Sequence, residues 1–129
     1  MIIPFSETVG IEEGVLKNEK KIHNHLGSIH AGAQFTFAEG ASGKYLASLF
    51  PDMQDEIIPL LRESSIKYKK QAWTSLKSDV SVDKEDVEKF TRQFASKGRA
   101  SIVAFVSLFD EEGDVTCEGS FKWFVQKTD

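Results

Sequence analysis

The segment that decides the fold is residues 30–50, which read HAGAQFTFAEGASGKYLASLF. On a helix drawn over this segment, apolar side chains fall on nearly every side, and Glu39 is the only charge before Lys44. A helix that is apolar all round is one surrounded by protein. Pro51 follows the segment and ends the helix. We therefore predict one central helix, about 30 Å long, inside the domain.

The sequence on both sides of this helix predicts strands. Residues 8–17 predict a short strand or a turn-linked pair of strands, and residues 18–23 predict a loop or ragged strand. Residues 57–61 contain a proline and predict a turn or connector. In residues 66–72 and 76–82, apolar side chains alternate with polar ones, which is typical of half-buried strands.

The C-terminal third predicts a second helix and a hairpin. Asp83 can cap the helix and Gly98 can end it. The apolar stripe of this helix consists of Val87, Phe90 and Phe94. Residues 100–109 and 115–126 follow as two strands joined by a tight turn. Short links favour an antiparallel sheet, so we expect a single α+β domain over residues 1–129, with that sheet wrapped around the central helix.

Composition excludes several classes of function. The chain has 129 residues and a net charge of −4 without a basic stripe, which makes nucleic acid an unlikely partner. One cysteine and three histidines argue against a structural metal site. The N-terminus lacks the pattern of a signal peptide, and no apolar run is long enough to span a bilayer. We expect a soluble cytoplasmic protein with no metal and no membrane partner.

The segment around the start of the central helix carries a recognisable motif. Asn24, the run His30-Ala31-Gly32 and Glu39 resemble the hotdog-fold thioesterase superfamily, particularly its phenylacetyl-CoA thioesterase-like branch. That branch has Asn, then His-Gly-Gly at the helix start, then an acid nine residues after the His. Ala31 stands where the branch usually has Gly. The rest of the chain is also similar to a group of hotdog proteins without a known function.

The resemblance implies a fold, a reaction and a set of site residues. It implies a hotdog fold and hydrolysis of an acyl-CoA or related thioester, without a cofactor other than the coenzyme A of the substrate. The implied catalytic residues are Glu39, as base or nucleophile, with Asn24 and His30. The backbone N–H groups of Ala31 and Gly32 would hold the thioester carbonyl oxygen. The same resemblance implies a homo-oligomer, a dimer or a dimer of dimers, with active sites across the dimer interface.

Helix geometry supports these roles independently of the family. A helix N-terminus carries unpaired N–H groups and about half a positive charge, which suits a developing oxyanion. Helical spacing predicts a narrow polar strip made of Gly32, Thr36, Glu39, Ser42 and Gly43. Phe35 adjoins this strip, and we expect the substrate to contact Phe35, Thr36 and Ser42.

Distance along the helix predicts a shared site. Ala31 and Glu39 are eight residues apart, which separates them by about 12 Å on one helix. An oxyanion donor and a base must both lie about 3 Å from the reacting group. If both residues act on one thioester, Glu39 must therefore come from a second copy packed antiparallel.

Each candidate also has a structural interpretation. Glu39 can pair with a polar group across a subunit interface, Asn24 can shape the turn before Gly27, and His30 can hydrogen-bond the backbone. A surface cluster of lysines is either a solvated strand face or a contact for coenzyme A phosphates. This cluster consists of Lys67, Lys69 and Lys70. Cys117 has no nearby base in the sequence and is interpreted as a packing residue.

Two further functions compete with hydrolysis. Ala31 in place of Gly motivates a non-catalytic acyl-binding hotdog module that keeps the fold without the chemistry. A hotdog dehydratase acting on 3-hydroxyacyl thioesters is disfavoured, because those enzymes resemble one another through a His near Pro-rich turns that this chain lacks.

Overall fold

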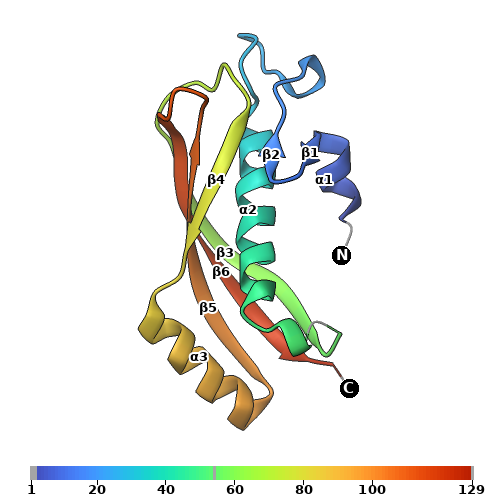
Figure 1. Ribbon diagram of the computed structural model, residues 1–129, viewed down its shortest axis with the longest axis vertical. Coiled ribbons are helices and arrows are strands. Elements are labelled where there is room, and N and C mark those ends of the chain that lie inside the picture. The colour runs from blue at the N-terminus through green and yellow to red at the C-terminus, as the bar shows by residue number, and fades with distance from the viewer. Residues whose placement is uncertain (1–2, 54, 129) are drawn as a thin grey trace.

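The long central helix is confirmed. In the computed structural model, which describes residues 3–53 and 55–128, helix α2 runs over Ala31–Ser48. His30 is its N-cap and Leu49 its C-cap. Its buried side chains belong to Ala33, Gln34, Phe37, Ala38, Ser42 and Leu46. The helix lies between the sheet and the N-terminal helix, as Figure 1 shows.

The described strands form one antiparallel sheet of six strands in the order β1-β2-β4-β5-β6-β3. Their bounds are β1 Ile11–Glu12, β2 Val15–Leu16, β3 Ile57–Tyr68, β4 Leu76–Ser81, β5 Arg99–Phe109 and β6 Val115–Lys127. The sheet curls around one side of α2 (Figure 1). The predicted architecture, an antiparallel sheet wrapped around a central helix, is therefore confirmed.

The prediction for residues 57–61 is wrong, because they are a strand and not a connector. They begin β3, and Pro59 pairs with Val125 of β6. Proline is tolerated on an edge strand, since its missing N–H can face away from the sheet. β3 is such an edge strand. The strand predicted at residues 66–72 is the far end of the same β3, which stops at Tyr68.

Helix α3, Lys84–Lys97, has the predicted ends and the predicted buried stripe. The Asp83 side chain accepts a hydrogen bond of 2.8 Å from a first-turn amide, and Gly98 closes the helix at φ 70°. Phe90 is 1% exposed and lies 5.1 Å from Phe50, measured between ring centroids. The predicted hairpin of β5 and β6 follows directly.

The N-terminal region contains a helix that the sequence did not predict. Residues 8–17 do include the hairpin of β1 and β2, but helix α1, Pro4–Val9, precedes it. Gly10 adopts a left-handed conformation at φ 93° and ends this helix. Within residues 18–23, a single 3-10 turn forms at Lys20–Ile22. Helix α1 packs against α2 on the side away from the sheet (Figure 1).

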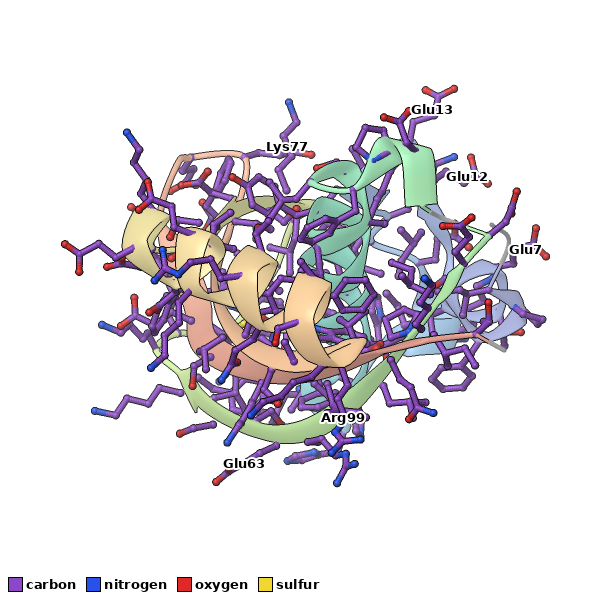
Figure 2. The ribbon with its side chains drawn as sticks, turned by 90° about the horizontal axis from the view of Figure 1, so that it is seen from below. Glu7, Glu12, Glu13, Glu63, Lys77 and Arg99 are labelled. Carbon is purple, nitrogen blue, oxygen red and sulfur yellow. The ribbon has the colours of Figure 1, made fainter. Side chains whose placement is uncertain are left out.

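The hydrophobic core fills the space between α2 and the sheet. Its most buried large side chains include Leu16, Ile29, Leu46, Leu76, Phe90, Leu108 and Phe121. Most charged side chains are exposed, and Figure 2 shows Glu63, Lys77 and Arg99 pointing away from α2. Cys117 is completely buried and packs in the core as predicted, and this burial raises the pKa of its thiol to about 12. Among the helices that the structure describes, none is long and apolar enough to cross a membrane.

Candidate active site

The start of α2 is capped by the residue that precedes it. Nδ1 of His30 accepts a hydrogen bond of 2.8 Å from the Gly32 N–H. A Cβ at Gly32 would lie only 3.0 Å from that same nitrogen, so the missing side chain makes room for the imidazole. Because Nδ1 accepts, a neutral ring carries its proton on Nε2. The backbone-bonding role of His30 is confirmed. Because the Gly32 N–H donates to His30, one of the two expected oxyanion donors is already occupied.

The amide of Ala31 differs from that of Gly32. Within residues 3–53 and 55–128, no group accepts a hydrogen bond from the Ala31 N–H. Ala31 is exposed, and its amide is one of the N-terminal donors that a helix leaves without an internal partner. The substitution of Ala for Gly therefore keeps a backbone donor available at the end of the helix where negative charge is favoured.

Asn24 shapes the loop that leads to this helix. Its Oδ1 accepts hydrogen bonds from the N–H groups of Leu26 at 2.9 Å and Ser28 at 3.1 Å, and its Nδ2 donates to Ser28 Oγ at 2.9 Å. Gly27 takes a positive φ of 89° at the tip of the loop. The turn role of Asn24 is confirmed. Its side chain acts on the loop, which in turn places His30.

Glu39 lies in the middle of α2 and is half-buried. Burial raises the pKa of its carboxyl group above the ordinary value for glutamate. In the described part of the chain, its carboxylate has no ion pair and no hydrogen bond. A carboxylate without a partner inside a protomer is costly unless a second molecule supplies one or chemistry uses it.

The predicted polar strip is divided, and Ser42 is a correction. Ser42 is completely buried, and its hydroxyl donates to the Glu39 carbonyl oxygen at 2.7 Å and accepts from Trp123 Nε1 at 2.9 Å. A Cβ at Gly43 would lie 3.1 Å from the Trp123 ring. The sheet curls far enough for β6 to cover this side of the helix. Ser42 therefore anchors α2 to β6 and does not face a substrate.

Thr36 and Phe35 lie on different sides of the helix. The Thr36 hydroxyl donates to the Gly32 carbonyl oxygen at 2.9 Å and lines a cavity beside α1. Phe35 is half-buried and packs against Phe121, with ring centroids 5.6 Å apart. Of this pair, only Thr36 lines that cavity.

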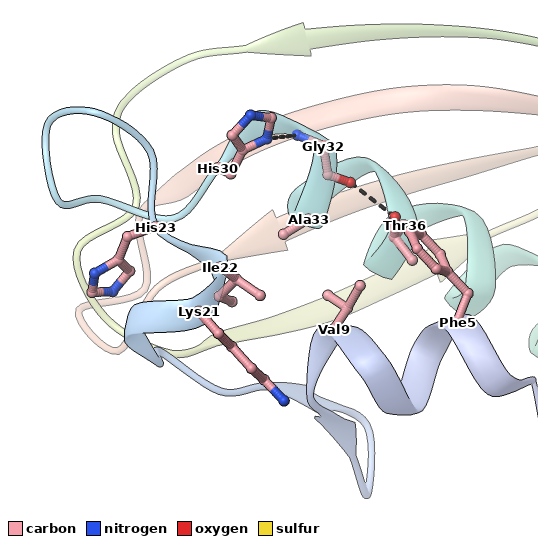
Figure 3. Close-up of a pocket in the computed structure, with 9 residues that line it drawn as sticks. All are labelled: Phe5, Val9, Lys21, Ile22, His23, His30, Gly32, Ala33 and Thr36. Atoms are coloured by element: carbon pink, nitrogen blue, oxygen red, sulfur yellow. Dashed lines mark hydrogen bonds between the residues drawn. The ribbon is translucent and has the colours of Figure 1, made fainter.

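A cavity of about 320 Å³ lies between α1 and the start of α2 (Figure 3). Its lining residues are Phe5, Val9, Lys21, Ile22, His23, His30, Gly32, Ala33 and Thr36. It therefore brings together three predicted residues, namely His30, Gly32 and Thr36. Ala31 borders these residues in sequence, whereas Asn24 and Glu39 do not line the cavity.

One side chain near the site was missed by the sequence analysis. The Tyr68 hydroxyl, at the end of β3, donates a hydrogen bond of 3.0 Å to the Ala31 carbonyl oxygen. The alternation in residues 66–72 predicts only a half-buried strand there. It contained no signal for a contact with a helix 37 residues earlier.

The predicted lysine cluster is largely engaged in ion pairs. Lys69 pairs with Glu118 at 2.8 Å, and Lys70 pairs with Asp110 at 3.2 Å and Asp114 at 2.9 Å. These pairs favour the solvated-face interpretation for both lysines. No group of three or more potential metal ligands occurs among the residues whose placement the structure describes.

Solved structures of thioesterase-like proteins have the same fold. The protein PA5026 of Pseudomonas aeruginosa, a probable thioesterase, is 21% identical with a TM-score of 0.77, over 98% of this chain and 89% of that one. BH2602 of Bacillus halodurans, solved with CoA, is 21% identical with a TM-score of 0.75, over 97% and 77% of the two chains. A variant of the thioesterase SAV0944 of Staphylococcus aureus is 16% identical with a TM-score of 0.74, over 96% and 99%.

At these identities the likeness shows the fold, and the predicted hotdog fold is confirmed. The comparison with curated proteins finds no match. The predicted similarity to a hotdog group without a known function is also confirmed, because a family model described as "Domain of unknown function (DUF4442)" matches residues 8–125. That range extends from the end of α1 into the last strand. The chain therefore belongs to the DUF4442 family.

Proposed function

We propose that this protein hydrolyses acyl-CoA thioesters at a site built by two copies of the chain. The observation that carries the proposal is a pair of unsatisfied groups on α2. One is the Ala31 N–H at the first residue of the helix, and the other is the half-buried Glu39 carboxylate in its middle. The relatives named as thioesterases support this reaction class at the level of fold, and BH2602 supports CoA as the carrier.

The second copy is proposed because one helix cannot bring both groups to one carbonyl. Their separation along α2 is about 12 Å. Strand β3 supports pairing, since it is a 12-residue edge strand with Ile58 44% and Leu60 49% exposed. Exposed edges of this kind accept a further strand. Two β3 edges related by a twofold axis would pair antiparallel and would set the two α2 helices antiparallel.

The proposed reaction begins with water. The Ala31 N–H donates to the thioester carbonyl oxygen while the partner subunit's Glu39 takes a proton from water. The water oxygen bonds to the carbonyl carbon, and the negative oxygen that results lies at the N-terminus of α2. The carbon–sulfur bond then breaks, and the leaving sulfur takes the proton from Glu39. The products are a carboxylic acid and free thiol. A raised pKa suits Glu39 to this exchange, because it brings the group closer to neutral pH.

The acyl group is proposed to enter the cavity beside α1. Most of its walls are apolar and come from Phe5, Val9, Ile22 and Ala33. Its volume of about 320 Å³ is roughly twice that of the cavity of about 150 Å³ that holds benzene in a protein core. A cavity of this volume accommodates a small aryl or medium-length acyl group.

A non-catalytic acyl-binding module is the second candidate, and one observation favours it. His30 occupies the Gly32 N–H, so the helix start offers one backbone donor instead of two. Removing one oxyanion donor typically costs about 100-fold to 1,000-fold in rate. A protein with this arrangement can bind a thioester without turning it over quickly.

Thiol release from a panel of aryl, short and medium acyl-CoAs tests hydrolysis directly. Glu39→Gln keeps the shape of the side chain and removes the base, so turnover should fall by about 100-fold or more. Glu88→Gln is the matched control, since Glu88 is an exposed carboxylate on α3, and it should retain full activity. Absence of thiol release from the wild type across the panel contradicts hydrolysis. Tight acyl-CoA binding that is unchanged in Glu39→Gln then supports the binding module.

A further inference from the structure

The peptide unit between Ala31 and Gly32 is held at both of its ends by side chains. Its carbonyl oxygen accepts a hydrogen bond of 3.0 Å from Tyr68, and its N–H donates one of 2.8 Å to His30 Nδ1. Tyr68, the peptide and His30 thus form a continuous chain of hydrogen bonds. Such chains polarise one another, so each bond strengthens the next.

Tyr68 reaches this peptide from the sheet. It is the last residue of β3, where it pairs with the buried Cys117 of β6. Burial, followed by the influence of Cys117, raises the pKa of the Tyr68 hydroxyl. A tyrosine hydroxyl keeps its proton at neutral pH even without this shift, and it is the donor to the helix carbonyl.

Two donors remain without a partner once this chain of bonds is in place. One is the Ala31 N–H, and the other is Nε2 of His30, for which the described residues provide no partner. The bond at Nδ1 determines the second donor, because it leaves the ring proton on Nε2. His30 also lines the cavity beside α1, so this ring lies where an acyl group is proposed to enter.

We infer that Tyr68 is a positioning residue for the carbonyl group of the bound thioester. Its bond to the Ala31 carbonyl oxygen fixes the first turn of α2 and, through the Gly32 N–H, the imidazole of His30. The Ala31 N–H and His30 Nε2–H are thereby held toward the ligand. This role rests on the proposed function. It also makes carbonyl binding depend on the end of the edge strand β3, on which the second copy is proposed to pair.

The test compares two ligands that cannot be hydrolysed. One is a 2-oxohexyl-CoA, which keeps a carbonyl group, and the other is hexyl-CoA, a thioether without one. The wild type should bind the ketone more tightly. In Tyr68→Phe, the dissociation constant of the ketone should rise about threefold to tenfold, as expected for one lost hydrogen bond, while that of the thioether stays the same. Isothermal titration calorimetry measures both constants.

Tyr45→Phe is the matched control, because Tyr45 is the other tyrosine of the chain and is 37% exposed on α2. It should change neither constant. In a wild type that turns over, Tyr68→Phe should lower kcat/KM by about tenfold, because the contact with the thioester carbonyl is weakened in the bound substrate and in the transition state. A Tyr68→Phe protein that keeps the ketone preference, or that weakens both ligands equally, overturns the inference.

The ligand pair separates this inference from the proposed hydrolysis. If the wild type releases no thiol, but prefers the ketone and Tyr68→Phe lacks this preference, hydrolysis is disproved and the positioning role is supported. A wild type that turns over thioesters but shows no preference for the ketone overturns the positioning role alone. A wild type that binds neither ligand overturns both.

Discussion

Helices α2 and α3 begin in opposite electrostatic ways. The first turn of α3 contains Glu85 and Asp86, and Asp83 caps it with a carboxylate. The first turn of α2 has no acidic residue, and its cap is an imidazole nitrogen. Acidic groups compensate the positive end of a helix, and each exposed acidic group there contributes about 0.3–1 kcal/mol. The chain therefore compensates the N-terminus of α3 and leaves the N-terminus of α2 available to an external negative charge.

The largest expected effect comes from removing the unpaired backbone N–H at the start of α2. Ala31→Pro deletes the unpaired N–H, and proline fits the first position of a helix. His30 already has the extended conformation that precedes proline, with φ −58° and ψ 139°. The rate of thioester hydrolysis should fall by about 100-fold to 1,000-fold, with little change in the unfolding temperature. Steady-state kinetics and thermal unfolding measure the two effects.

Lys84→Pro provides the matched control on α3. Lys84 occupies the same first helical position, and Asp83 before it is likewise extended, at φ −61° and ψ 131°. This variant should keep both stability and turnover. Equal losses of activity in the two proline variants would show that α2 has no special role as a donor.

The Asp83 cap should have a smaller effect, confined to stability. Asp83→Ala removes the acceptor of the Glu85 N–H, so the free energy of unfolding should fall by about 1 kcal/mol. Turnover should stay the same, because α3 packs on β5 and lies outside the site. Urea unfolding measures the change, with Glu88→Ala as a control that removes an exposed carboxylate from the same helix. A similar loss of stability in both variants would contradict a capping role.

The contrast between these helices also explains what the sequence could predict. Both ends of α3 follow from Asp83 and Gly98, since capping and a left-handed stop are local properties. The burial of α2 follows from its apolar composition. The face that each of its side chains occupies does not, because a helix that is apolar all round carries no record of which neighbour covers which side. Ser42 was misplaced for that reason, and its contact with Trp123 depends on how far the sheet curls.

Other misses also depend on tertiary context. Pro59 argues against a strand unless the strand is known to lie at a sheet edge, which only the complete topology reveals. Helix α1 has only six residues, too few for a clear period, and is stabilised by its contact with α2. Tyr68 contacts the Ala31 carbonyl across 37 residues, so no local pattern could assign it to the site. His30 and Gly32 could be placed together at the start of a helix because they belong to a contiguous motif.

The smallest expected effect is a pH dependence of stability at Glu39. Burial raises the pKa of its carboxyl group, so the folded chain binds this proton more tightly than the unfolded chain does. As pH rises from the ordinary glutamate value through the raised one, the folded state therefore loses stability relative to the unfolded state. Below both values, and above both, the contribution of Glu39 no longer changes.

Glu39→Gln does not titrate, and thermal unfolding of both proteins between about pH 4 and about pH 8 isolates this contribution. The unfolding temperature of Glu39→Gln minus that of the wild type should increase with pH and then level off above the raised pKa. The half-buried carboxylate remains in contact with water, which screens the effect and should keep it below that of the Asp83 cap. A difference that is constant with pH would show that the carboxyl group is not desolvated on folding. A difference that decreases with pH would show that a cation or hydrogen-bond donor, which a second copy could supply, stabilises the charged form.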